Sequence, residues 1–177
     1  MRKVSYATGL NVVMGSGWYQ RLYHPNNMDQ RTVEDLSEEI IRDITVGVGD
    51  TGIRSGIIGE VGIEGNPITP NEEKSIRASA RASRATGAAI SFHRGGLGRE
   101  KLDVIGMLGE EGADLSRVIF GHSDRIAGDM PLMLELLEHG VYIQFDLLGH
   151  VGVPFSVGPL RENNPVATYA SPALVAD

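Results

Sequence analysis

The chain contains no cysteine, and this absence excludes several kinds of site together. A disulfide framework, a thiolate zinc finger, an iron–sulfur cluster and a cysteine nucleophile all require the missing side chain. Any metal site must therefore be built from histidine and carboxylate side chains.

Long apolar runs and an excess of positive charge are also missing. No stretch of about 18 apolar residues occurs, and no apolar run of the kind found in signal peptides follows the basic N-terminal residues. We therefore expect a cytoplasmic protein. The formal net charge is −7, from 16 Lys and Arg against 23 Asp and Glu, which would repel phosphate backbones and anionic lipid surfaces. Neither nucleic acid nor a membrane is expected as a partner.

Short apolar runs alternate with segments of helical periodicity along the 177 residues. Strands are expected at residues 10–14, 55–58, 88–91, 118–120 and 141–145, and helices from residue 32 and over 70–86, 100–108 and 130–138. Strands that alternate with helices in units of roughly 25 to 40 residues are typical of a parallel α/β sheet, either a barrel or a doubly wound sheet.

Local signals mark where two of these helices begin. Thr32 and Asp35 form a capping pair, and Thr69 is followed by a proline and by Glu72 at the third helical position. Gly87 is expected to end the second helix.

Metal-capable side chains follow the expected strands. Glu60, His93, His122 and Asp146 each come one or two residues after an apolar run. The carboxyl ends of parallel strands lie on one rim, where the active sites of α/β barrels are built. Two imidazoles and a carboxylate are a common zinc ligand set that leaves a position for a water nucleophile. The pattern predicts a hydrolytic metal site; the alternative is that each histidine is a satisfied loop or core residue.

Several motifs in order resemble the phosphotriesterase family of the amidohydrolase superfamily, and its phosphotriesterase homology proteins most. They are GIIGEVG at residues 56–62, ITPNEEK at 68–74, SFH at 91–93, LSRVIFGHSD at 115–124 and YIQFD at 142–146. The resemblance covers residues 5–160 and implies a (β/α)₈ TIM barrel with divalent metals, usually zinc, at the carboxyl ends of its strands.

The resemblance also implies roles for individual residues. Glu60 matches the bridging metal ligand of the family's fourth strand, and His93 and His122 match the ligands of the fifth and sixth strands. Tyr19 matches an aromatic pocket residue beside the metals and would contact the substrate; its alternative is a packing aromatic. Asp146 could orient a histidine ligand by accepting its hydrogen bond, or could be a capping or salt-bridge residue.

Two features of the family have no match in this sequence. The family carries a His-x-His pair on its first strand and an aspartate on its eighth, whereas the resemblance begins near the third strand and ends just after the seventh. We therefore expect residues 1–177 to form a single incomplete TIM-barrel hydrolase domain with about five βα units, loop-rich and truncated over 149–177. Its open edges, bearing Val12, Val13, Ile143 and Phe145, would favour self-association.

The expected function is zinc-dependent hydrolysis of a small-molecule ester-type substrate, a phosphoester or a lactone, by attack of a metal-bound hydroxide. The alternative is a non-catalytic truncated barrel that binds metal weakly or needs a partner chain. A doubly wound nucleotide-binding domain is disfavoured, because the glycine string at residues 47–52 follows a helix and precedes a strand. His24 and His150 are expected in loops, and His139 at the end of a helix.

Overall fold

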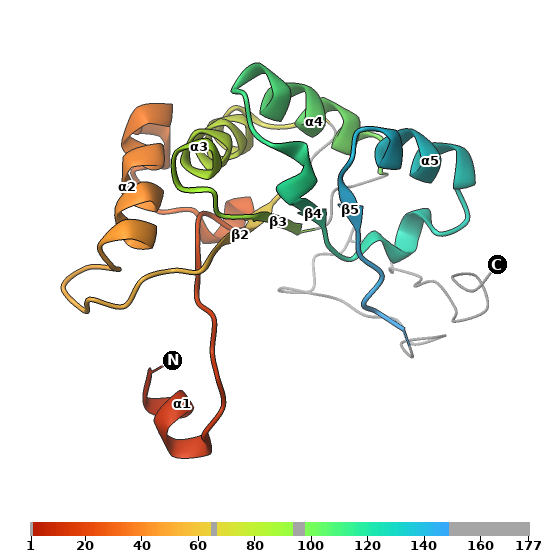
Figure 1. Cartoon of the computed structure of the whole chain (residues 1–177). Coiled ribbons are helices and arrows are strands. Elements are labelled where there is room, and N and C mark those ends of the chain that lie inside the picture. The colour runs from red at the N-terminus through yellow and green to blue at the C-terminus, as the bar shows by residue number, and fades with distance from the viewer. Residues whose placement is uncertain (1, 65–66, 94–97, 149–177) are drawn as a thin grey trace.

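The computed structural model describes residues 2–64, 67–93 and 98–148. Five parallel strands form one sheet in the order β1-β2-β3-β4-β5, and helices α2 to α5 lie in an arc along one side of it (Figure 1). The strands are β1 (Gly15–Ser16), β2 (Ile57–Gly62), β3 (Ile90–His93), β4 (Val118–Phe120) and β5 (Tyr142–Ile143). The helices are α1 (Arg2–Thr8), α2 (Val33–Thr45), α3 (Pro70–Thr86), α4 (Glu100–Glu110) and α5 (Met130–Glu138). Short 3₁₀ turns lie at η1 (Arg21–Tyr23), η2 (Met28–Gln30), η3 (Leu115–Arg117) and η4 (Ser123–Ile126).

The strand order separates the two architectures that the alternation of elements left open. A doubly wound sheet reverses its strand order and places helices on both faces. Here the strands follow one another in sequence order and the helices α2 to α5 share one side (Figure 1). The expected parallel α/β fold, a partial (β/α)₈ barrel, is confirmed.

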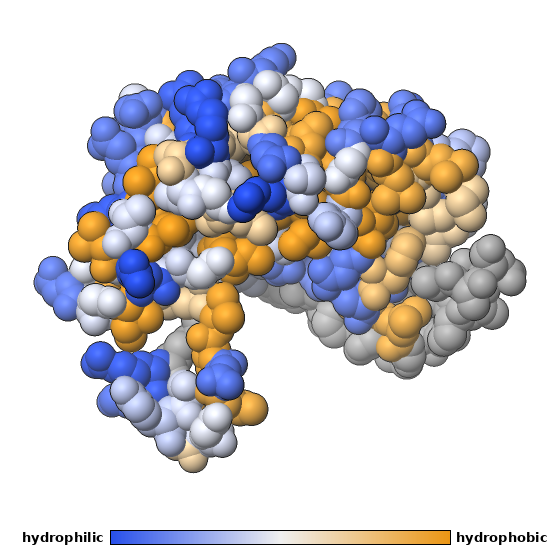
Figure 2. Space-filling view, viewed as in Figure 1, coloured by the Kyte–Doolittle hydropathy of each residue, from blue (hydrophilic) through white to orange (hydrophobic). Residues whose placement is uncertain are grey.

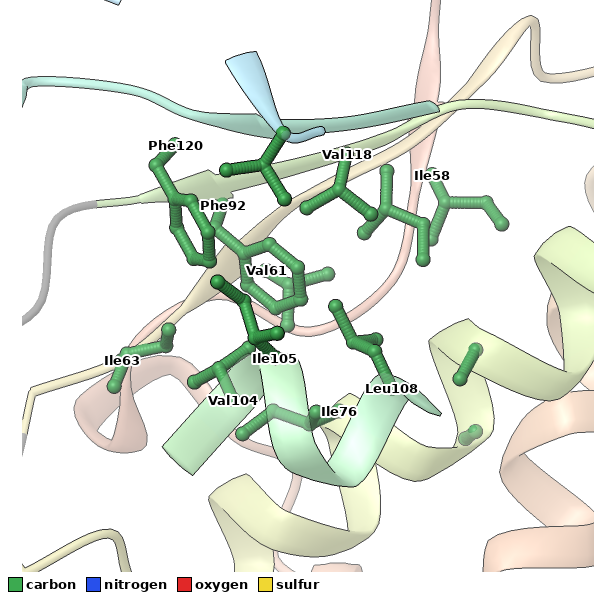
Figure 3. Packing of buried hydrophobic residues seen from close by; sticks show 14 of the residues in the cluster. Ile58, Val61, Ile63, Ile76, Phe92, Val104, Ile105, Leu108, Val118 and Phe120 are labelled. Carbon is green, nitrogen blue, oxygen red and sulfur yellow. The ribbon is translucent and has the colours of Figure 1, made fainter. Parts of the chain in front are cut away.

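The core lies between the sheet and the helices (Figure 3). Phe92 of β3 and Phe120 of β4 are fully or almost fully buried, and their ring centroids lie 5.4 Å apart in a stacked arrangement. Val104 and Leu108 of α4 pack below them, with Ile76 of α3. This layer anchors β3 and β4, the two strands from which the expected histidine ligands emerge.

Both predicted helix starts are confirmed. The Thr32 hydroxyl accepts a hydrogen bond from the Asp35 amide while the Asp35 carboxylate accepts one from the Thr32 amide, which is a capping box. Thr69 and Glu72 form the same arrangement at α3, and Gly87 ends that helix in the left-handed conformation, with φ of 75°. The buried Glu72 carboxylate also accepts a hydrogen bond from the Glu64 amide, which ties the chain after β2 to α3.

Four strands differ from their expected bounds, and the one expected at 141–145 is limited to Tyr142–Ile143. Residues 10–14 form no strand; β1 begins at Gly15, and Val12 and Val13 are 44% and 72% exposed. At Gly15, a Cβ would lie 1.9 Å from the Gly59 carbonyl oxygen, so that only glycine allows the approach of β1 to β2. The strand expected at 55–58 runs instead to Gly62, so Glu60 lies within it, and His93 is the last residue of β3.

The N-terminal helix was not expected from the sequence. α1 has no buried residue, and it stands away from the sheet in Figure 1. Hydrophobic side chains are exposed along the segment that joins α1 to the sheet (Figure 2). Within the described part of the chain, no helix has both the length and the apolar character that crossing a membrane requires. The expected loop-rich segment 149–177, with His150, lies outside the described residues.

An ion-pair network joins three of the helices. Arg81 of α3 contacts Glu111, which follows α4, at 2.7 Å, and Glu34 of α2 at 3.1 Å. Arg77 of α3 lies 3.3 Å from the same Glu111. The hydrogen bonds from Arg81 and the charges of both arginines lower the pKa of Glu111 below its ordinary 4.5.

The lowered pKa of Glu111 predicts a pH-dependent contribution to stability. Because the folded-state pKa lies below the unfolded value, the contribution is present above about pH 4.5 and is lost as the pH falls through the folded pKa. We expect Glu111→Gln to reduce the free energy of unfolding at pH 7 by about 0.2–1 kcal/mol, a difference that closes as the pH falls through the folded pKa. Urea unfolding across this pH range measures it. The control is Glu138→Gln, since Glu138 has no ion pair among the described residues; an equal loss in both variants would contradict the prediction.

Self-association through the sheet edges stays a prediction, with one correction. Val12 and Val13 are exposed but do not belong to a strand, so the N-terminal edge is β1 itself. At the other edge, Ile143 and Phe145 are partly buried against the core. An edge strand that presents free backbone groups can pair with another chain. We expect light scattering at micromolar concentration to show dimers or larger species of the 177-residue chain; a monodisperse monomer would contradict this.

Candidate metal centre

Three of the predicted site residues meet at the carboxyl ends of adjacent strands. One potential ligand atom from each of Glu60, His93 and His122 lies within 4.8 Å of the other two. Glu60 Oε2 is 3.4 Å from His93 Nδ1, and Glu60 Oε1 is 3.3 Å from His122 Nε2. The two imidazole rings meet edge to face, with their centroids 4.8 Å apart. A carboxylate between two imidazoles is a donor set suited to a divalent cation.

Glu60 reaches this position through a β-bulge. Gly59 pairs with Ser91 and Val61 with the next residue, Phe92, so Glu60 is the extra residue in β2. Its neighbours Ile58 and Val61 are both fully buried, whereas the Glu60 side chain is 38% exposed. A bulge bends the strand and changes the direction of a side chain, and bulges are frequent beside active sites.

His122 reaches the site through an unusual backbone conformation. Its φ of 49° lies in the left-handed region, and it has the only positive φ among the non-glycine residues that the structure describes. Holding such a residue in this region costs on the order of 1 kcal/mol, and residues of this kind cluster at functional sites. Gly121, just before it, lies close to β3, since a Cβ there would lie 3.1 Å from the Phe92 carbonyl oxygen.

Asp146, for which the sequence left two roles open, contacts His122. Asp146 Oδ1 accepts a hydrogen bond of 2.7 Å from His122 Nδ1, and Oδ2 accepts one of 2.6 Å from the Gln144 side-chain amide. With the proton on Nδ1, the lone pair of His122 lies on Nε2, the atom that faces Glu60. Asp146 follows β5 by three residues rather than by the expected one or two.

Tyr19 also points into the site. Its hydroxyl lies 3.0 Å from His93 Nε2 and 3.2 Å from Nδ1, and the two ring centroids are 4.6 Å apart. His24, expected only as a loop residue, donates from Nε2 to the Tyr19 carbonyl at 2.9 Å. This contact could not be predicted from the sequence, because neither residue belongs to a spaced motif. His139 lies at the C-terminal cap of α5, as expected.

The charge of the site is set by Glu60. A hydrogen bond with His93 is the largest influence that lowers the pKa of the Glu60 carboxyl; partial burial opposes it, and the charges of His93 and His122 add to the lowering. Glu60 is therefore ionised at neutral pH, and the ionised form is the one that binds a metal.

The comparisons with known proteins agree with these motifs and this geometry. A model of the phosphotriesterase family matches residues 1–162. An N-acetyltaurine hydrolase from Dictyostelium discoideum is 42% identical over 147 residues, which cover 83% of this chain and 40% of that protein. The chain spans about half the length of the curated relatives it matches, or somewhat less.

Two solved structures show the same arrangement of elements. The phosphotriesterase homology protein from Escherichia coli, crystallised with phosphate in its active site, is 36% identical with a TM-score of 0.72, over 84% of this chain and 50% of that one. A mutant of a PTE-like lactonase from Deinococcus radiodurans is 28% identical with a TM-score of 0.79, over 99% of this chain and 51% of that one. The resemblance carried by the motifs is thereby confirmed, and the chain belongs to the phosphotriesterase family.

Proposed function

We propose that this chain provides part of the active site of a metal-dependent hydrolase, with Glu60, His93 and His122 as ligands of a zinc ion. The observation that carries the proposal is the meeting of these three side chains from the ends of β2, β3 and β4. Family membership supports it, because relatives that share the fold are named as hydrolases and lactonases.

The chemistry of the donor set supports zinc. Glu60 faces the two imidazoles with different oxygens, Oε2 at 3.4 Å from His93 Nδ1 and Oε1 at 3.3 Å from His122 Nε2. One ligand atom from each of the three residues lies within 4.8 Å of the other two. The two imidazoles and one carboxylate would leave a coordination position for water.

The side chains of this chain would bind and orient rather than exchange groups. A divalent ion at the site would supply Lewis-acid activation of water and of the bond to be cleaved. Glu60 supplies the negative charge that holds the ion, and Asp146 fixes the ring orientation of His122 through the Nδ1 hydrogen bond. Tyr19, with its hydroxyl beside His93, would contact the substrate and place it against the ion.

An ester-type bond, a phosphoester or a lactone, is the substrate class that the family resemblance favours. One observation favours a second candidate: several relatives, among them the one from Dictyostelium discoideum, are named N-acetyltaurine hydrolases. N-acetyltaurine carries an amide rather than an ester. A lactone and an amide are both cleaved by attack of water on a polarised carbonyl carbon, and a phosphoester by attack of water on a polarised phosphorus, so one metal site could serve any of them.

Removal of one ligand should weaken metal binding. We expect the wild-type chain to bind at most one equivalent of zinc, and His122→Ala to bind it at least about tenfold more weakly, since loss of a mere hydrogen-bond partner of a ligand already costs 10- to 100-fold. Calorimetric titration of the chain measures both values. The matched control is His139→Ala, which removes an exposed imidazole at the end of α5. Equal affinity of His122→Ala and the wild type would remove His122 from the site.

Hydrolysis by the chain should depend on metal and should be slow. No residue of this sequence matches the family's strand-eight aspartate, and a general base typically contributes about 10²- to 10⁴-fold. We therefore expect rates at least about 100-fold below those of a full-length relative measured in parallel. The assay compares an aryl ester, a lactone, a phosphotriester and N-acetyltaurine, with zinc and after chelation. Hydrolysis that survives chelation, or that Glu60→Ala leaves unchanged, would contradict the proposal.

A further inference from the structure

A buried carboxylate outside the donor set holds the segment that carries Asp146. Asp124 lies in η4, just after His122, and is only 2% exposed. Its Oδ2 accepts a hydrogen bond of 3.4 Å from the Asp146 amide, and its Oδ1 accepts one of 3.2 Å from the Leu147 amide. Burial of a carboxylate is costly unless it is hydrogen-bonded, so these two contacts account for its position.

Apart from the packing of Phe145 against the core, few contacts among the described residues fix the backbone at Asp146. β5 contains only two residues, and the pairing beyond it consists of Gln144, whose amide donates to the Phe120 carbonyl at 2.9 Å and whose carbonyl accepts from the Ser123 amide at 3.0 Å. After Gln144, the described residues that follow β5 make three hydrogen bonds with the residues that follow β4. Two of them go to Asp124, and the third joins His122 to Asp146. Asp124 therefore fixes the place from which the Asp146 side chain reaches His122.

The chain of contacts ends at a potential ligand atom. Asp124 binds the backbone of Asp146, the Asp146 carboxylate accepts the Nδ1 proton of His122, and His122 Nε2 faces Glu60. We infer that Asp124 is a positioning residue that sets the tautomer and orientation of His122 by acting through Asp146. The part of this inference that concerns metal affinity rests on the proposed function; the part that concerns the tautomer does not.

The alternative is that Asp124 only stabilises the turn after β4. An Asp124→Asn variant distinguishes the two, because one oxygen is kept while an amide group replaces the other and cannot accept from a backbone amide. The matched control is Asp114→Asn. Asp114 also accepts a hydrogen bond from a backbone amide, that of Ser116 at 3.0 Å, but it lies before β4, at the opposite end of the strand from the site.

The first readout is the tautomer of His122 in the metal-free chain, from imidazole ¹⁵N shifts. We expect the Nδ1–H form in the wild type and in Asp114→Asn, and a shift toward the Nε2–H form in Asp124→Asn and in Asp146→Ala. An unchanged tautomer in a folded Asp124→Asn variant would overturn the inference.

The second readout is zinc affinity in a double-mutant cycle. Asp124→Asn should lower the affinity of the wild type by about tenfold, and should change that of Asp146→Ala by less than about twofold, because the route through Asp146 is already gone. An equal loss in both backgrounds would assign Asp124 a general structural role and overturn the inference. If the wild type binds no zinc, the proposed function fails, while the tautomer still decides the role of Asp124.

A measurement on the unmodified chain covers the case in which Asp124→Asn does not fold. The amide protons of Asp146 and Leu147 should exchange with solvent as slowly as that of Gln144. They should exchange more slowly than the amide proton of Gly140, which lies exposed in the turn after α5. Rapid exchange of both amides in the wild type would show that Asp124 does not hold this segment and would overturn the inference.

Discussion

Side chains alternate between the two faces of a strand, and this alternation alone would keep the site from forming. In β2, strict alternation would place Glu60 on the face of Ile58, which packs against the helices. After β4, it would place His122 on the face of Phe120. The bulge at Glu60 and the left-handed conformation of His122 each shift this alternation of side chains by one residue. Both side chains then lie on the side where β3 already places His93.

Glycine residues permit these shifts in the side-chain alternation. Gly59, next to the bulge, has φ of 138°, and a Cβ there would lie 2.5 Å from the Ser91 carbonyl oxygen. Gly15 allows β1 to approach Gly59, and Gly121 allows a close approach to the Phe92 carbonyl oxygen. The glycines around the site therefore allow the backbones to approach closely, in addition to separating one element from the next.

The sequence predicted the elements better than the positions of the side chains. The apolar runs and capping pairs of α2 and α3 are local signals, and local contacts decide where such helices begin. The common rim of Glu60, His93 and His122 was predictable as well, because it follows from the parallel direction of the strands. The bulge, the conformation of His122 and the burial of Asp124 depend on pairing between segments far apart in sequence. No spacing rule contains that information.

The same long-range contacts explain why the site favours a cation. Asp146 accepts from Nδ1 of His122, so in the neutral imidazole the Nε2 lone pair would face the ionised Glu60 oxygen at 3.3 Å. Two electron-rich atoms at this distance repel one another unless a proton or a cation lies between them. On the other side of Glu60 lies His93, which also contacts the Tyr19 hydroxyl. Asp124, by fixing Asp146, keeps the His122 ring facing Glu60, so that a proton or a divalent ion between the two atoms relieves the repulsion.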